Sequence, residues 1–144
     1  MVIKNPFKAL LAKTPQTLAS VLNISDDAAT AAFVEEHLTV NGYVVYPAPN
    51  IPDALTILES DQQIDLIICD FTNPDVDGRD FLHRARLRLG RRSLPPVMFL
   101  RDAEDDEEIA RQMEVTDLLP KPVDPQMLVC CVQKLTQVIS PTDK

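Results

Sequence analysis

The chain has 144 residues, of which 45% are hydrophobic, so it can form one domain with a proper core, and a second domain is not expected. Its net charge of −8 argues against a nucleic-acid-binding surface that covers the whole molecule. Three cysteines give neither a disulfide framework nor a zinc pattern, and no apolar run reaches the ~18 residues of a membrane span, so we expect a cytoplasmic protein.

Apolar runs alternate with stretches of helical periodicity, which is typical of β and α elements wound into a parallel sheet. In chain order, the pattern predicts a strand at 17–24, a helix at 28–41, a strand at 43–46, a helix at about 52–60, a strand at 64–69, a helix at about 78–89, a strand at 96–100, a helix at 104–113, a brief strand at 117–119 and a helix at about 125–139. The third strand is apolar on both faces, as expected of a central parallel strand. We take 16–140 as one domain, 1–15 as an N-terminal extension and 141–144 as a C-terminal tail.

Charged residues follow three of the expected strands. Asp26 and Asp27 come after the first strand, Asp70 ends the third, and Lys121 follows the fifth. In an open parallel sheet, ligands bind beyond the carboxyl ends of the strands, so these residues can meet in one crevice. Two carboxylates with loop carbonyls suit Mg²⁺, and a nearby ammonium balances a bound phosphoryl group. We therefore predict that Asp70 accepts a phosphoryl group.

The sequence resembles the receiver domain of two-component response regulators over about residues 17–139. Five motifs carry the resemblance, in order along the chain: ISDD (24–27), NGY (41–43), DLIICDFTNPDVDG (65–78), LPPVMFL (94–100) and DLLPKP (117–122). Each motif is weak alone. Together, at the spacing of the family, they are specific.

The resemblance implies a flavodoxin-like α/β fold, a (βα)5 three-layer sandwich with a five-stranded parallel sheet in the order 2-1-3-4-5. It implies phosphorelay signalling, not an enzyme: Asp70 takes a phosphoryl group from a sensor histidine kinase or a phosphotransfer protein, Lys121 pairs with that group, and an altered contact with a downstream protein carries the signal. Asp26, Asp70 and the backbone carbonyl of Thr72 are implied to hold Mg²⁺. In the family the Lys-Pro bond is often cis, which we expect for Lys121–Pro122.

The chain departs from the family pattern at several positions, and three of them bear on the expected site. Ser25 stands where the family has the first acid of its usual pair, so we expect weaker Mg²⁺ binding. Arg101 replaces the Ser or Thr of the family's switch, and Leu118 replaces its aromatic partner in the fifth strand. Arg101 either reaches a phosphoryl oxygen with its fork of donors or pairs with the acids at 102–108 and points to solvent. Asp27 either compensates for the missing acid or caps the first helix.

Two other functions are open at this point. A pseudoreceiver shares the fold but binds partners without phosphorylation, and Ser25, Arg101 and Leu118 favour it. A phosphatase similar to haloacid dehalogenases is a remote alternative, because LIICDFT (66–72) echoes an apolar strand followed by Asp-x-Asp. Thr72 replaces the acid that such an enzyme needs as proton donor, and the chain lacks room for a cap domain.

The last helix is apolar on more than one face, which indicates a partner surface, and we consider a homodimer through the last two helices. Within this helix, Cys130 and Cys131 are expected to be small apolar filler in the core. The basic run at 78–92 is expected to be a solvated helix face or, alternatively, a docking patch for an acidic partner, and nucleic acid is not expected. No output domain follows the last helix in this sequence, so we expect either a module that works by docking alone or a fragment.

Overall fold

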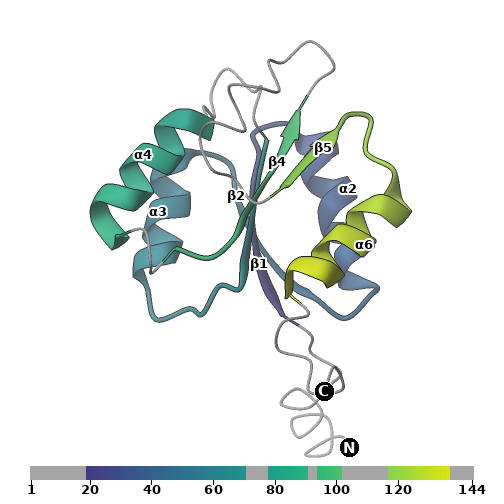
Figure 1. Cartoon of the computed structure of the whole chain (residues 1–144), viewed down its shortest axis with the longest axis horizontal. Coiled ribbons are helices and arrows are strands. Elements are labelled where there is room, and N and C mark those ends of the chain that lie inside the picture. Colours follow the sequence, from purple (N-terminus) through teal and green to yellow (C-terminus); the bar gives the residue numbers. More distant parts are fainter. Residues whose placement is uncertain (1–18, 71–77, 91–93, 102–116, 137–144) are drawn as a thin grey trace, which may run out of the picture.

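Five parallel strands form one sheet in the order β2-β1-β3-β4-β5 (Figure 1). The computed structural model describes residues 19–70, 78–90, 94–101 and 117–136. The strands are β1 (Ser20–Ile24), β2 (Val44–Ala48), β3 (Leu66–Asp70), β4 (Val97–Arg101) and β5 (Asp117–Pro120). The helices in the described residues are α2 (Ala28–Thr39), α3 (Ile51–Glu59), α4 (Gly78–Leu89) and α6 (Pro125–Thr136). The fold class and the strand order predicted from the sequence are confirmed.

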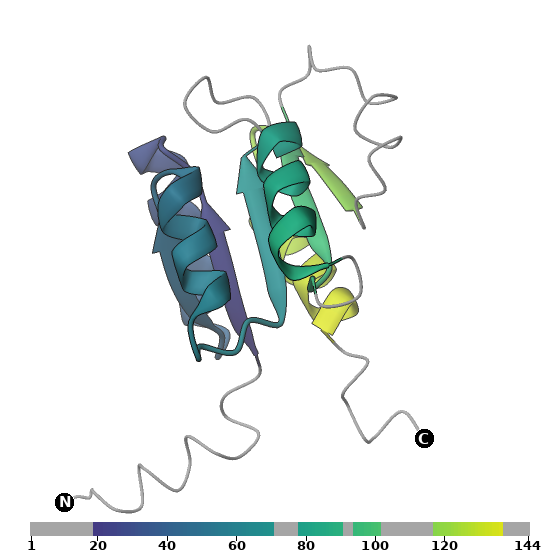
Figure 2. The same cartoon turned by 90° about the vertical axis from the view of Figure 1, so that its left-hand side faces the viewer.

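Helices cover both faces of the sheet. On one face lie α3 and α4, and on the other lie α2 and α6 (Figure 1). Turned to the first face, the molecule shows α3 and α4 side by side in front of the strands (Figure 2). This three-layer arrangement removes the central strands from water on both sides, which is the usual environment of a parallel sheet.

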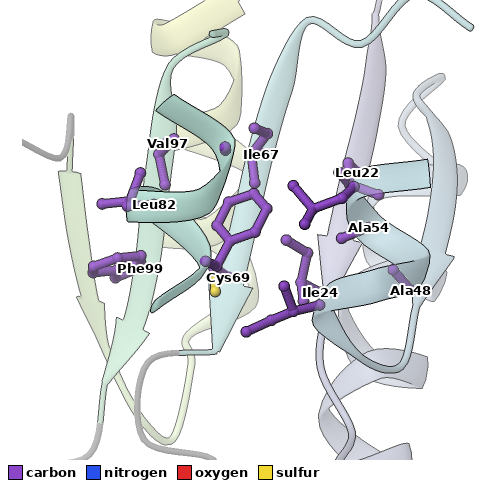
Figure 3. Close-up of a cluster of buried hydrophobic side chains, with 13 residues drawn as sticks. Leu22, Ile24, Ala48, Ala54, Ile67, Cys69, Leu82, Val97 and Phe99 are labelled. Atoms are coloured by element: carbon purple, nitrogen blue, oxygen red, sulfur yellow. The ribbon is translucent and has the colours of Figure 1, made fainter. Parts of the chain in front are cut away.

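The two cores divide the strand residues by their alternation. In β3, Ile67 and Cys69 pack toward α3 and α4, together with Leu22 and Ile24 of β1 (Figure 3). Leu66 and Ile68 of β3 pack on the opposite face with residues of α2 and α6. Because successive side chains of a strand point to opposite faces, a strand with helices on both sides reads as an unbroken apolar run.

Several boundaries differ from the predicted ones. The second strand was predicted at 43–46, but β2 runs from Val44 to Ala48 and includes Pro47. A proline fits there because β2 is an edge strand, with a neighbour on only one side. The first predicted helix ends two residues early, at Thr39, and Gly42 follows with a positive φ of 97°. The predicted helix at 104–113 lies outside the described residues.

The last helix corrects one prediction about the core. Leu128, Val132 and Thr136 are its buried residues, four positions apart, whereas Cys130 is exposed and Cys131 is half-buried. Cys130 is therefore not core filler, because it lies on the side of α6 that faces away from the sheet. None of the helices in the described ranges has the length and apolar character that crossing a membrane requires.

Tyr43 is buried at the edge of the core between α2 and α6. Burial raises the pKa of its phenol above the usual value of 10.0, against the opposing effect of a hydrogen bond with the side chain of Thr136. Because folding raises the pKa of this phenol, the folded state favours the neutral phenol over the phenolate more strongly than the unfolded state does. That contribution is present below pH 10 and is lost as the pH rises through the folded-state pKa.

We therefore expect Tyr43→Phe to flatten the loss of stability in alkaline solution. Between pH 9.5 and 11, which brackets the usual phenol value near 10, the free energy of unfolding in urea should fall less steeply for Tyr43→Phe than for the parent chain. Tyr46→Phe, which removes the other of the two tyrosines, is the control and should follow the parent. Identical slopes for Tyr43→Phe and the parent would contradict this account of Tyr43.

Candidate functional site

Asp70 is the last residue of β3 and has no exposed surface. Its strand is the third of the five in spatial order, between β1 and β4, and Leu100 of β4 is its neighbour in register. The apolar residues that precede it hold β3 in the interior, so the strand carries a carboxylate to the rim of the sheet without exposing it. An isolated carboxylate in that position costs several kcal/mol unless charge and hydrogen bonds compensate it.

Lys121 supplies the compensating charge. Its Nζ lies 2.6 Å from Oδ1 of Asp70, and its side chain is only 19% exposed. Lys121 directly follows β5, on the far side of β4 from Asp70, so the parallel order of three strands brings the two residues together. The Lys121–Pro122 peptide bond is cis, as predicted. Asp70 and Lys121 thus form an ion pair across the carboxyl ends of the strands.

Ser25 contacts the other oxygen of the same carboxylate. Its Oγ lies 3.3 Å from Oδ2 of Asp70, where the hydroxyl can donate, and it accepts a hydrogen bond of 3.2 Å from the backbone N–H of Asp27. The backbone oxygen of Asp27 is an alternative acceptor at 3.4 Å, because one hydroxyl has one proton to give. Both oxygens of Asp70 therefore have a partner in the chain itself.

This contact of Ser25 was missed in the sequence. In the sequence analysis, Ser25 was identified only as a residue that stands where an acid was expected. Serine just before a helix commonly forms hydrogen bonds with the nearby backbone, so a contact with a distant residue was not expected. The signal that would have found the contact is its position: Ser25 follows β1, which is paired directly with β3, so residues at the ends of these strands are neighbours. A small side chain there can reach the Asp70 carboxylate.

The two acids after Ser25 occupy different places. Asp26 is half-buried, and its Oδ1 atom is buried. Asp27 is exposed and is the N-cap residue of α2, where its carboxylate accepts a hydrogen bond from the hydroxyl of Thr30. That hydrogen bond lowers the pKa of Asp27 below its usual value, with a smaller contribution from the charge of Lys121. Asp27 thus occupies the N-cap position of α2, although its side chain makes no capping hydrogen bond, and its compensation for the missing acid stays a prediction.

Three predicted site residues are described only in part or not at all. Thr72 lies outside the described residues. Arg101 ends β4 and Leu118 lies in β5, with Leu118 opposite Phe99 and Arg101 opposite Pro120 in the parallel register. The side chains of Arg101 and Leu118 also lie outside the described part. Their expected roles therefore stay predictions.

The donor atoms at the rim are hard oxygens of the kind that Mg²⁺ prefers. Asp26 and Asp70 offer carboxylates and Ser25 a hydroxyl, while Lys121 offsets one negative charge. Among the described residues, no three His, Cys, Asp or Glu side chains are placed to hold a metal ion together. These oxygen atoms therefore fit Mg²⁺. Ser25 offers a neutral hydroxyl at the position where a second carboxylate was expected.

An open hollow of about 260 Å³ adjoins this site. It lies between the first turns of α2 and the segment that joins β5 to α6. Its lining is mainly apolar and includes Phe33, Pro122 and Val123, with Lys121 at one side. Because Lys121 touches both this hollow and Asp70, a molecule seated in the hollow would lie next to the ion pair.

Comparison with known proteins gives consistent matches. The family model "Response regulator receiver domain" matches residues 21–133. A 14.6 kDa protein encoded beside sodA1 in Leptolyngbya boryana is 33% identical, and the match covers 88% of this chain and 98% of that protein. The transcriptional regulatory protein AfsQ1 of Streptomyces coelicolor is 32% identical over 77% of this chain, which spans only 48% of that regulator. The crystal structure of a putative response regulator from Chloroflexus aurantiacus is 30% identical, with a TM-score of 0.72, over 83% of this chain and 98% of that one.

The ion pair at the centre of the site can be tested by a double-mutant cycle. We expect Lys121→Met to lower the free energy of unfolding by about 3 kcal/mol, because it leaves a buried carboxylate without its counter-ion. In an Asp70→Asn background the same substitution should cost much less, since an amide needs no counter-ion. Urea unfolding of the four proteins measures the coupling. Equal losses in both backgrounds would contradict the pairing.

Proposed function

The chain belongs to the response regulator receiver domain family, and from this premise we propose that it serves in phosphorelay signalling by accepting a phosphoryl group on Asp70. One observation carries the proposal: a fully buried carboxylate at the carboxyl end of the central strand is paired with Lys121 at 2.6 Å. An ion pair that only stabilised the fold could lie anywhere in the core. This pair lies at the rim of the sheet, where ligands of parallel α/β proteins bind. The family match favours this function over the phosphatase alternative.

In the proposed reaction, a carboxylate oxygen of Asp70 attacks the phosphorus of a phosphohistidine on the donor protein. The P–N bond breaks, the imidazole nitrogen leaves with its electron pair, and an acyl phosphate forms on Asp70. Lys121 is placed to exchange its contact with Oδ1 for one with an oxygen of the arriving group, so that its positive charge follows the negative charge. Ser25 keeps the carboxylate oriented through the oxygen that Lys121 does not contact.

Asp26, Asp70 and the backbone carbonyl of Thr72 would hold Mg²⁺ in this proposal. When bound, Mg²⁺ supplies the positive charge that neutralises the oxygens of the transferring group. Ser25 replaces one charged ligand by a neutral hydroxyl, so the chain's own residues offer less negative charge to the ion. We expect weak binding for that reason.

The donor, a sensor histidine kinase or a phosphotransfer protein, would approach through the hollow beside Lys121. Phe33, Pro122 and Val123 give that hollow an apolar wall, which suits the apolar face of a helix that carries a reactive histidine. Lys121 lines one side of the hollow and contacts Asp70, so a donor in the hollow would lie next to Asp70.

After phosphorylation, Arg101 and Leu118 are proposed to carry the change in shape, in place of the usual hydroxyl and aromatic pair of the family. The output would be an altered protein contact, with a homodimer through the last two helices as one form of it. A pseudoreceiver is the second candidate. It is favoured by one observation, that both oxygens of Asp70 already have partners in the chain, which can close the site to a donor.

Phosphorylation of the intact chain separates these two candidates. With Mg²⁺ and a small phosphodonor such as acetyl phosphate, we expect the parent to gain one phosphoryl group by intact mass, because Asp70 is the carboxylate that Lys121 contacts directly. Asp70→Asn should gain none. Asp53→Asn, which removes an exposed acid at the start of α3, should behave like the parent. A parent chain that gains no mass at any Mg²⁺ concentration is a pseudoreceiver.

The role of Ser25 has a separate test. We expect Ser25→Asp to tighten Mg²⁺ binding by about tenfold, because it restores a charged oxygen ligand. Ser25→Ala, which removes the hydroxyl without adding charge, should show no such gain. Shifts of backbone amide signals during a Mg²⁺ titration give the affinity without requiring phosphorylation. If Ser25→Asp binds Mg²⁺ no more tightly than the parent, Ser25 does not lie in the metal site.

A further inference from the structure

A second hollow lies on the same helical layer, away from Asp70. It has a volume of about 320 Å³ and is formed where the end of α2 passes the first turns of α6. His37 and Asn41 line it from the α2 side, and Val129, Cys130 and Gln133 line it from α6. Most of the lining surface is apolar. We call it the α2/α6 groove.

Exposed apolar residues flank the lining residues of the groove in the sequence. Next to its lining residues in the chain, Met127 of α6 is 50% exposed, and Val40, the C-cap residue of α2, is 74% exposed. Cys130 is itself exposed within the groove. The groove itself is lined on the α6 side by Val129 and Cys130, and an exposed apolar hollow is a candidate contact surface.

The chain carries a segment whose pattern fits this groove. Residues 1–15, MVIKNPFKALLAKTP, lie outside the described residues. Within them Asn5 and Pro6 form a helix-start signal, and Phe7, Leu10 and Leu11 have the i, i+3, i+4 spacing of one helix face. The pattern predicts a two-turn amphipathic helix with a single apolar side.

The point of attachment places this segment close to the groove. Ala19 is the first described residue, and its backbone oxygen accepts a hydrogen bond of 3.0 Å from the N–H of Val44. Asn41, which lines the groove, is only three residues before Val44. The four residues 15–18 can span up to about 14 Å when extended. The segment can therefore reach the groove of its own chain without strain.

Charge supports the same pairing. The segment holds Lys4, Lys8 and Lys13 and no acidic residue, in a chain whose net charge is −8. Glu35 and Glu36 are exposed in α2, two residues and one residue before His37 in the sequence. A basic segment and a chain of net negative charge are complementary in charge.

We propose that residues 1–15 fold back onto the α2/α6 groove of their own chain, with Phe7, Leu10 and Leu11 against Val129 and Cys130. The tether makes this contact intramolecular, so even a modest affinity suffices.

Docking there would also touch the donor hollow. His37 lines the groove and Phe33 lines the hollow, and their ring centroids are 4.3 Å apart. A segment seated against His37 would therefore lie beside the surface that receives the donor. This last consequence rests on the proposed function, whereas the docking itself does not.

Alkylation of Cys130 in the full chain tests the docking. The protein carries Cys131→Ser, so that Cys130 is the reactive thiol and Cys69, fully buried, reports any unfolding. We compare the parent with Leu11→Asp, on the apolar side of the predicted helix, and with Ala12→Asp, a change of equal charge on its other side. The maleimide reaction at Cys130 should quicken about fivefold in Leu11→Asp, as for a groove covered about four-fifths of the time. Ala12→Asp should match the parent.

Equal rates in all three proteins would overturn the proposal, because the segment would then leave the groove open. Protection that increases with protein concentration would also overturn it, since the occupant would be a second copy of the chain. A faster reaction at Cys69 identifies a variant that has lost its fold, and Leu10→Asp then replaces it. The readout needs no phosphodonor, so it stands even if Asp70 is never phosphorylated.

Discussion

The burial of one carboxylate governs the arrangement of this site. Asp70 is carried to the rim by a strand whose side chains are all buried, and it would be unfavourable there without a positive charge nearby. Lys121 provides that charge from the end of β5, and Ser25 provides a hydrogen-bonding partner from the end of β1. Three strands that are far apart in the sequence must therefore lie in one order and in register for the site to exist. The sheet order β2-β1-β3-β4-β5 satisfies this requirement.

Much of this could be predicted from the sequence, because the relevant patterns are local. The apolar run before Asp70 indicated a central strand, and the order of motifs indicated a parallel sheet that gathers Asp70 and Lys121. What was missed depends on tertiary context. The contact of Ser25 with Asp70 follows from strand neighbours and not from any residue near Ser25. The exposure of Cys130 depends on how α6 is rotated about its axis. The buried side of α6 holds Leu128, Val132 and Thr136, and Cys130 lies outside it.

The chain combines the ion pair of Asp70 and Lys121 with unusual residues at three nearby positions of the motif pattern. Asp70 and Lys121 are in contact, whereas Ser25, Arg101 and Leu118 stand where the sequence interpretation expects an acid and the two switch residues. The hydroxyl of Ser25 offers no negative charge to a cation, and Ser25 and Lys121 together contact both oxygens of Asp70. On the same helical layer, Phe33 and His37 connect the hollow beside Lys121 to the α2/α6 groove. The surface of α2 and α6 is thus the face through which we expect both the donor and the chain's own N-terminal segment to act.

The central claim is that Asp70 and Lys121 together form the seat of a phosphoryl group. A crystal structure of the protein with Mg²⁺ and beryllium trifluoride, which mimics a phosphoryl group on a carboxylate, tests it most directly. The account predicts the mimic bonded to one oxygen of Asp70, with Nζ of Lys121 moved from Oδ1 to a fluorine atom. A structure in which the 2.6 Å contact between Lys121 and Asp70 persists, with the mimic absent from Asp70 at saturating concentration, would contradict it.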